Sequence, residues 1–190
     1  INGDGAGKPQ GVLSSPALVT VAKEAAQAAT TFNFENAINM WKRLWARSRA
    51  PAVWFLNQDV EAQLFSLKLS SGTSVAQGVT PYAGIATIYT PPGVNGNITA
   101  MLMGRPVLPI EQCATLGTLG DVILADMSQW IYIDKGAPQQ AVSMHVKFLT
   151  DEQTFRSIYR VDGQGWWHSA LTPFKGSNTL SPFVALAARS

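Results

Sequence analysis

The order of two hydrophobic periods along this 190-residue chain constrains its fold more than any other feature. A helical period comes first, over residues 34–48, and strand-like patterns follow Gly120. At about 100° per residue, the apolar side chains of the first segment share an arc of roughly 120°. Asn33 or Thr31 is placed to cap it. The pattern predicts a helix that buries two tryptophans and presents a basic face, with apolar positions at Phe34, Ala37, Ile38, Trp41, Leu44 and Trp45.

A buried strand and a second helix are predicted directly after this segment. Residues 52–56 form an apolar run bounded by Pro51 and Asn57, as expected for a buried strand. Asn57 is also placed to cap a helix over roughly residues 58–69, which has two carboxylates in its first turn. We expect helix, strand and helix to pack as one layered unit.

Glycine-rich and proline-rich stretches surround these elements. Residues 1–11 carry four glycines and predict a turn-rich loop. From Ser70 to Gly120 the periodicity weakens between turn-forming clusters. We expect loops there, with short strands at 85–89 and 98–103.

Strand patterns dominate after Gly120. The segment "DVILADMSQWIYID" predicts two strands around residues 126–128. Residues 142–148 alternate apolar and polar side chains, which predicts a half-buried strand. The segment "TFRSIYRVDG" predicts another strand that ends at a glycine turn. We expect a sheet with one face on a core and the other face either wet or in an interface.

Charged side chains of that last strand form the most informative candidate site. Arg156 and Arg160 are four residues apart, so in a strand they project from the same face. Asp162 joins that face, and Asp151 lies just before the strand. A row of guanidinium and carboxylate groups suits bidentate pairing across a subunit boundary. Intrachain or solvated surface charges are an equally good interpretation.

Composition leaves two interpretations open. Charged residues make up only 14% of the chain, against a typical share of about 25%, and there are 6 tryptophans. Interface cores share this depletion of charge and enrichment in aromatics, but so does a compact, Trp-rich core. The net charge of +2 is too small to argue for nucleic-acid binding. Four basic residues are interpreted as the solvated face of the first helix, with contact to DNA or an anionic membrane as the alternative: Lys42, Arg43, Arg47 and Arg49.

No pattern in the chain predicts a catalytic, cofactor or metal site. The stretch "GDGAGKP" lacks the spacing of a phosphate-binding loop, and Pro9 removes an amide that a phosphate cradle needs. His145 and His168 are the only histidines, and no nucleophile-elbow motif accompanies them. One cysteine, Cys113, supplies no paired metal-ligand spacing. We therefore predict no enzyme, with a small hydrolase that uses one of the histidines as the weakest alternative.

Three further features bear on the cellular setting. The lone cysteine excludes an intrachain disulfide framework, which favours cytosolic folding. No stretch approaches the roughly 20 apolar residues of a membrane span, and the start is not signal-like. Because the chain begins at Ile1 and not at Met, we expect a fragment or a processed product.

The order of motifs from Met103 onward resembles the HK97-type major capsid family of tailed phages. The resemblance rests on four stretches and a spaced series of residues: "GRPVLP", "LGTLGDVILADMSQWIYID", "SMHVKFLTDEQTFRSIYRVDG" and "SALTPFK", with Ser143, Phe148, Asp151, Arg156, Arg160, Asp162 and Gly163. Upstream, "NGDGAGKPQGVL" looks like the family's glycine-rich link after its spine helix. "APAVWFLNQDVEAQLFSL" looks like its strand followed by an Asn-initiated helix. Residues 113–117 depart from the pattern.

The resemblance implies an α+β, HK97-like capsid fold with two domains. Residues 1–120 would form an axial-type domain, to which the tail at 171–190 returns. Residues 121–170 would form a β-rich, peripheral-type domain. The family's N-terminal arm, extended loop and spine helix would precede Ile1.

The resemblance also implies a structural role without cofactors. The subunit would self-assemble into pentamers and hexamers of a shell that encloses phage DNA, assembled in the bacterial cytoplasm and ending in the virion capsid. Contact with DNA would be generic, a scaffold or a maturation protease would be a further partner, and no membrane would be involved. We expect assembly contacts at Asp151, Arg156, Arg160 and Asp162. An encapsulin-like nanocompartment of the same fold, enclosing cargo enzymes, is the alternative.

Overall fold

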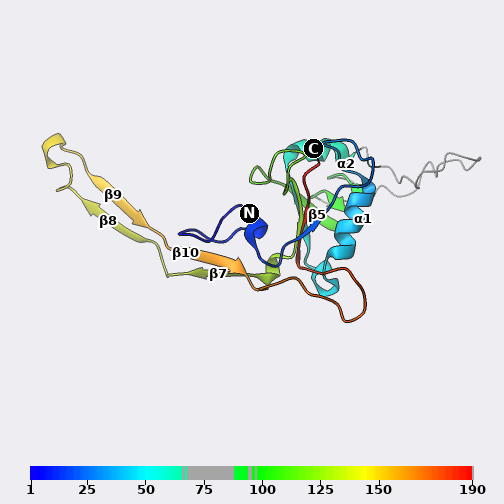
Figure 1. The fold of residues 1–190 in the computed structure, drawn as a ribbon. Coiled ribbons are helices and arrows are strands. Elements are labelled where there is room, and N and C mark those ends of the chain that lie inside the picture. Colours follow the sequence, from blue (N-terminus) through cyan, green and yellow to red (C-terminus); the bar gives the residue numbers. More distant parts are fainter. Residues whose placement is uncertain (66, 68–87, 94–95, 97, 190) are drawn as a thin grey trace, which may run out of the picture.

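The chain forms a body around one sheet and a long arm that projects from the body (Figure 1). The computed structural model describes residues 1–65, 67, 88–93, 96 and 98–189. Among these residues, the body sheet has seven strands, and the arm consists of two successive two-stranded ribbons.

The body sheet has the strand order β1-β11-β6-β2-β5-β4-β3. β1 pairs with β11 and β2 with β5 in parallel, whereas the other neighbours are antiparallel. The strands are β1 (Val19–Val21), β2 (Val53–Leu56), β3 (Tyr89–Thr90), β4 (Met101–Leu102), β5 (Arg105–Pro109), β6 (Val122–Ala125) and β11 (Phe183–Leu186).

The central strands β6 and β11 are buried at every residue. Both are continuous apolar runs, which is the pattern of strands covered on both faces. Val122 and Leu124 belong to one buried cluster, whereas Ile123 and Ala125 belong to another. Because alternate residues of a strand project to opposite faces, the sheet carries a core on each side.

β6 belongs to the body sheet although it lies after residue 120, where the sequence predicts that the first region ends. It pairs with β2 and β11 inside the body sheet, so residues 122–125 pack with the first predicted region and not with the second. The division into axial-type and peripheral-type domains stays a prediction.

Helix α1 (Phe34–Arg43) is shorter than the predicted helix over 34–48. Leu44 takes up extended backbone, and the Trp45 amide donates to the Ser181 carbonyl at 3.0 Å. The chain then makes a 3-10 turn, η2 (Ala46–Arg49). A contact with the C-terminal part of the chain thus replaces the last helical turn. Trp41 and Trp45 are half-buried and not enclosed, which corrects the prediction that the helix buries both.

The predicted strand and helix that follow are confirmed. β2 occupies the predicted strand, and α2 (Gln58–Leu64) follows it at once. The Asn57 side chain accepts a hydrogen bond from the Asp59 amide at 3.0 Å, as expected for an N-cap. The helix ends at Leu64, earlier than the predicted residue 69. Residues 66 and 68–69 of that prediction lie outside the described residues.

The stretch between Ser70 and Gly120 is described only in part. Most of the strand predicted over 85–89 lies outside the described residues, and β3 begins at its last position. The strand predicted over 98–103 is reduced to β4, because Met103 and Gly104 both adopt positive φ in the turn to β5.

The arm contains the strands predicted after residue 126, but in shorter pieces. Its inner ribbon pairs β7 (Trp130–Asp134) with β10 (Val161–Gly165), and its outer ribbon pairs β8 (Gln139–Ser143) with β9 (Thr154–Ile158). The strand predicted over 142–148 is wrong beyond Ser143, where the chain turns into η5 (Phe148–Thr150). The single strand predicted for "TFRSIYRVDG" is also wrong, since Tyr159 and Arg160 separate β9 from β10.

A buried ion pair, which the sequence did not predict, fastens the C-terminal segment to the body. Arg189 and Asp121 are both 0% exposed, and Arg189 binds both carboxylate oxygens, with Nη1 to Oδ1 at 3.1 Å. The Gly117 amide donates to the same carboxylate at 2.9 Å. The backbone continues the link, because Arg189 N–H donates to the Gly117 carbonyl at 2.7 Å.

Candidate assembly surfaces

Packing around one tryptophan fixes the base of the arm to the body. Trp130, the first residue of β7, meets Phe183 edge-to-face with ring centroids 6.2 Å apart. A Cβ on Gly163 would lie 2.9 Å from the Trp130 indole nitrogen, so the close approach of the indole to β10 requires glycine. The Gln10 amide donates to the Gly163 carbonyl at 2.8 Å. The inner ribbon therefore starts from a defined position on the body.

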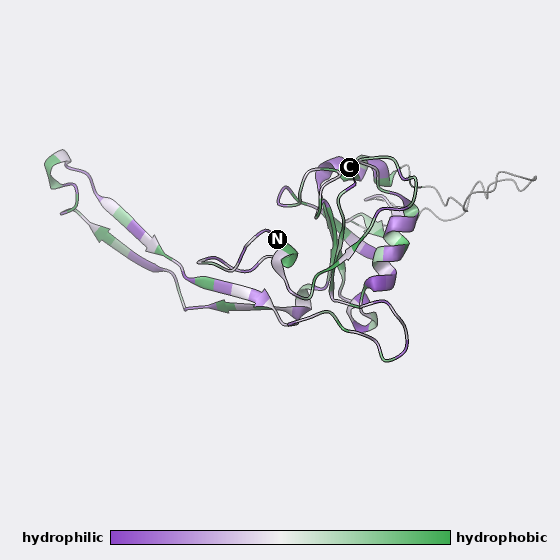
Figure 2. Cartoon of the chain, in the orientation of Figure 1, coloured by the Kyte–Doolittle hydropathy of each residue, from purple (hydrophilic) through white to green (hydrophobic). Residues whose placement is uncertain are grey.

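Beyond this base the arm exposes large apolar side chains. Figure 2 shows hydrophobic stretches along the arm as far as its end. Leu149 is 99% exposed and Phe148 is 74% exposed. The exposed apolar residues of the arm are Tyr132, Ile133, Val142, Met144, Val146, Phe148, Leu149, Phe155 and Tyr159. Large apolar side chains exposed in such number mark interaction sites in soluble proteins.

The outer ribbon has two different faces. Val142 lies directly opposite Phe155, and both are exposed. Ala141 lies opposite Arg156, and because alternate residues point to opposite sides, this pair occupies the other face. One face of the ribbon therefore carries the Val142–Phe155 pair beside polar Gln140 and Ser157, and the other carries the Arg156 guanidinium group.

The four charged residues predicted as assembly contacts all lie on the arm. Asp151 is at its end, in a left-handed conformation with φ of 54°. Arg156 is in β9, Arg160 is in the break after β9, and Asp162 is in β10. Asp162 accepts the Gly163 amide at 2.8 Å. Within the described part of the chain none of the four forms an ion pair, so the structure does not join them into one intrachain row.

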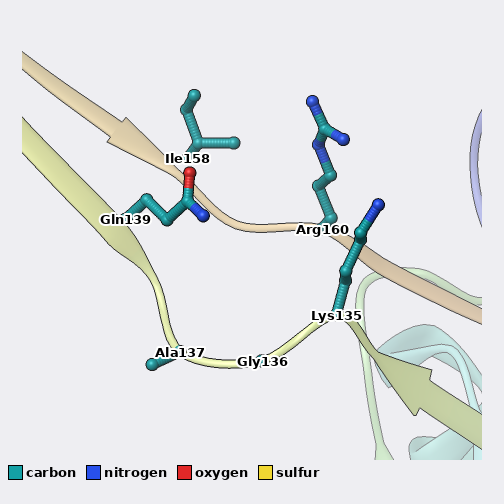
Figure 3. A pocket seen from close by; sticks show the side chains of 6 residues that line it. All are labelled: Lys135, Gly136, Ala137, Gln139, Ile158 and Arg160. Atoms are coloured by element: carbon teal, nitrogen blue, oxygen red, sulfur yellow. The ribbon is translucent and has the colours of Figure 1, made fainter.

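A small notch lies where the two ribbons meet. It has a volume of about 210 Å³ and is lined by Lys135, Gly136, Ala137, Gln139, Ile158 and Arg160, a set that we call the joint notch. Figure 3 shows Lys135, Ile158 and Arg160 projecting to the same side of the arm. Ile158 shares its face of the outer ribbon with Arg156, two residues before it. Three cationic side chains thus follow one side of the arm.

Comparison with known proteins places the body and arm in one protein family. A family model described as the phage capsid family matches residues 1–176. The chain belongs to the phage capsid family. None of the curated proteins compared with it matches.

Solved capsid structures share the fold of this phage capsid family chain. One, titled "Capsid of empty GTA particle computed with C5 symmetry", has a TM-score of 0.60 and 19% sequence identity, covering 99% of this chain and 60% of that one. The capsid of the native GTA particle has a TM-score of 0.63 and 18% identity, covering 99% and 59%. The chain thus spans about 60% of the length of those capsid chains. The predicted α+β capsid fold is confirmed.

Two tyrosine hydroxyl groups bridge the arm of this phage capsid family chain. Tyr132 of β7 and Tyr159 of the break are hydrogen-bonded through their hydroxyl groups. That bond raises the pKa of Tyr132, with smaller contributions from desolvation and from the Tyr159 and Asp134 charges. Both tyrosines are exposed, so the bridge braces the surface of the ribbon and not a core.

The basic cluster near α1 is divided between two settings, which corrects its description as one helix face. Lys42 and Arg43 lie in the last turn of α1, and Arg43 Nε donates to the Thr179 carbonyl at 2.7 Å. Arg47 and Arg49 lie beyond the helix, in η2, and stack on tryptophan rings. Their guanidinium carbons are 5.7 Å from the Trp45 ring and 5.4 Å from the Trp41 ring. Cation–π contacts thus hold the Arg47 and Arg49 guanidinium groups against tryptophan rings of the same chain.

The remaining chemical candidates occupy ordinary structural positions. "GDGAGKP" is a turn in which Asp4 accepts the Ala6 amide and pairs with Lys8 at 3.3 Å. His145 lies near the end of the arm, where its amide donates to the Ser143 hydroxyl at 3.2 Å. No group of three potential ligands could hold a metal ion among the described residues. In the same part of the chain, no helix has the length and apolar character needed to cross a membrane.

Proposed function

We propose that this chain is the body and arm of a structural capsid subunit, which assembles with copies of itself into the pentamers and hexamers of an icosahedral shell around phage DNA. The observation that carries the proposal is the arm, which extends away from the body and exposes large apolar side chains without a core of its own. Membership of the phage capsid family supports the same role. The chain acts by non-covalent contacts, and we assign it no catalytic step.

Each part of the structure has a place in this proposal. The body would be the axial-type domain, near the centre of a capsomer, and the arm from β7 to β10 would be the peripheral-type domain. A scaffold or a maturation protease would act on the subunit during assembly in the bacterial cytoplasm. The finished subunit would reside in the capsid of the particle and touch the DNA only generically, in keeping with the net charge of +2.

Shortening the arm tests the proposal. The Lys135 amide donates to the Arg160 carbonyl, so these residues form a hydrogen-bonded antiparallel pair, and an Asn-Gly turn that replaces residues 136–159 can close a hairpin there. The complete gene product that contains this chain should form closed particles visible by electron microscopy. The arm-shortened variant should keep the same thermal unfolding of the body but form no particles. Closed particles from the shortened variant, or a complete product that stays monomeric at high concentration, would contradict the proposal.

The content of the particles separates a virus shell from a protein compartment. Particles isolated from cells carrying the complete phage gene set should hold nuclease-protected DNA. Particles that hold a protein cargo and no DNA would favour the encapsulin-like alternative instead.

A further inference from the structure

The inner and outer ribbons of the arm meet at a joint, where the two connecting segments differ in length. Asp134 and Val161 are the last partners of the inner ribbon, and Gln139 and Ile158 are the first of the outer ribbon. Four residues, 135–138, connect β7 to β8, whereas two residues, 159–160, connect β9 to β10. The longer link must bulge, and Gly136 turns it at φ of 88°. The sequence thus builds the joint notch at a fixed place.

The pairing at this joint sets two like charges against each other. The Lys135 amide donates to the Arg160 carbonyl at 3.0 Å, which makes these residues cross-strand neighbours. Figure 3 shows their side chains extending side by side in the same direction. Like charges directly opposite each other destabilise a ribbon. No carboxylate among the described residues forms an ion pair with either cation, which leaves both side chains open to one.

The joint notch is suited to one carboxylate group. A volume of about 210 Å³ lies below the roughly 300–1,000 Å³ of pockets for drug-sized ligands and leaves room for the end of an acidic side chain. The Arg160 guanidinium can bind a carboxylate with two parallel hydrogen bonds, and the Lys135 ammonium supplies a second charge. Two acids line the neighbouring surface, Asp134 and Asp162, but neither pairs with a cation there.

We propose that the joint notch of one copy binds the Asp151 carboxylate of a second copy. The tip of one arm, which is the connection between β8 and β9, would then dock where the two ribbons of another arm meet. The inference rests on the proposed function and specifies one contact of the assembled shell. Its partner is a second copy of this chain because the whole outer ribbon separates the tip from the joint of the same arm (Figure 1).

Charge at the tip identifies the carboxylate. Glu152 is occupied by an ion pair with Lys147, but Asp151 forms none within the described residues. Asp151 is exposed, and its left-handed backbone places it at the turn directly after η5. Leu149, two residues earlier, is 99% exposed, so docking would cover an apolar side chain together with the ionic contact. The tip thus offers both charge and apolar surface to the joint of another copy.

A charge exchange tests the contact in the complete gene product. Arg160→Asp and Asp151→Arg should each lower the yield of closed particles at least tenfold, because each places like charges together. The double variant should recover at least a third of the unchanged yield. Lys175→Asp, which changes an exposed lysine of the body loop by the same charge, is the matched control and should leave the yield unchanged.

The outcomes separate this contact from the proposed function. If the unchanged product forms no particles, the proposed function fails. If it assembles and the single variants assemble equally well, only the tip-to-joint contact is overturned. Failure of the double variant to recover would assign the joint notch to another acid, such as Asp59 or Glu61 of α2, and would also overturn the proposal.

Disulfide trapping gives a second measurement that does not depend on particle yield. With Asp151→Cys and Arg160→Cys in the same chain, mild oxidation of assembled material should link copies covalently on a non-reducing gel. The native Cys113 is buried and should not interfere. Asp151→Cys combined with Lys175→Cys should give no such ladder. A ladder of equal strength from both pairs would refute the specific contact.

Discussion

Replacing Arg189 by methionine tests how much the buried Arg189–Asp121 ion pair stabilises the body. In the folded chain the guanidinium neutralises the Asp121 carboxylate, and both side chains are fully excluded from solvent. Methionine fills similar space but leaves a buried carboxylate whose remaining partner is the Gly117 amide. Removing one partner of a buried ion pair costs about 3–5 kcal/mol. At roughly 2–4 °C per kcal/mol for a chain of this size, the melting temperature should fall by about 6–20 °C.

Two further variants show whether the loss of stability comes from the burial of the ion pair and from the unpaired carboxylate that remains. Lys8→Met breaks the Asp4–Lys8 pair, whose side chains are 60% and 57% exposed, and should change the free energy of unfolding by less than about 1 kcal/mol. Asp121→Asn combined with Arg189→Met removes the stranded charge and keeps an acceptor for the Gly117 amide. This double variant should be more stable than Arg189→Met alone.

Urea denaturation followed by tryptophan fluorescence measures all three variants on one scale. If Arg189→Met is as stable as Lys8→Met, the buried pair does not hold the C-terminal segment to the body. If the double variant is no more stable than the single one, a stranded carboxylate is not the cause of the loss.

Three other predictions concern the thiol, the tip and the outer ribbon. Desolvation, with a smaller contribution from the Asp121 charge, raises the pKa of Cys113 to about 11 from 9.0. The thiol should resist alkylation at pH 8 until the chain unfolds. Because the pKa of the thiol is higher in the folded chain, its contribution to folding stability is complete below pH 9 and should be lost as the pH rises toward 11. Cys113→Ala should abolish this pH dependence of the free energy of unfolding. Leu149→Ser should lower particle yield while leaving the urea midpoint unchanged, since the side chain is 99% exposed in the single chain. Amide hydrogen exchange in β8 and β9 should slow at least tenfold on assembly, because an isolated two-stranded ribbon is only marginally stable. Exchange in β6 should be the same in both states.

Local patterns were sufficient where a single chain completes the packing. The apolar run before Asn57 and the cap at Asn57 predicted β2 and the start of α2, because strand, cap and helix are all specified by neighbouring residues. The end of α1 was missed for the opposite reason. Leu44 leaves the helix to contact Ser181, and nothing in residues 34–48 signals a partner so distant in the sequence.

The buried ion pair was missed because charge spacing carries little information about tertiary contact. Asp121 and Arg189 are 68 residues apart, and neither has a periodic context that marks it as buried. A charged residue is almost never fully buried unless it is paired, so only the fold reveals which two of the 26 charged residues form this bond.

The arm exposes a different limit of sequence reasoning. Alternation over residues 142–148 was interpreted as a half-buried strand, yet Val142 is 61% and Val146 70% exposed in the single chain. A sequence records which side chains are to be covered, but not whether the cover comes from the same chain or from another copy. The two interpretations of low charge and abundant tryptophan meet the same limit. Trp54 is completely buried in the body, whereas Trp166 is 70% exposed beside the base of the arm. The compact-core interpretation fits the body, whereas the interface interpretation stays a prediction for the arm. The body has the core of an ordinary globular domain, and the arm leaves large apolar side chains exposed for which we propose cover by other copies.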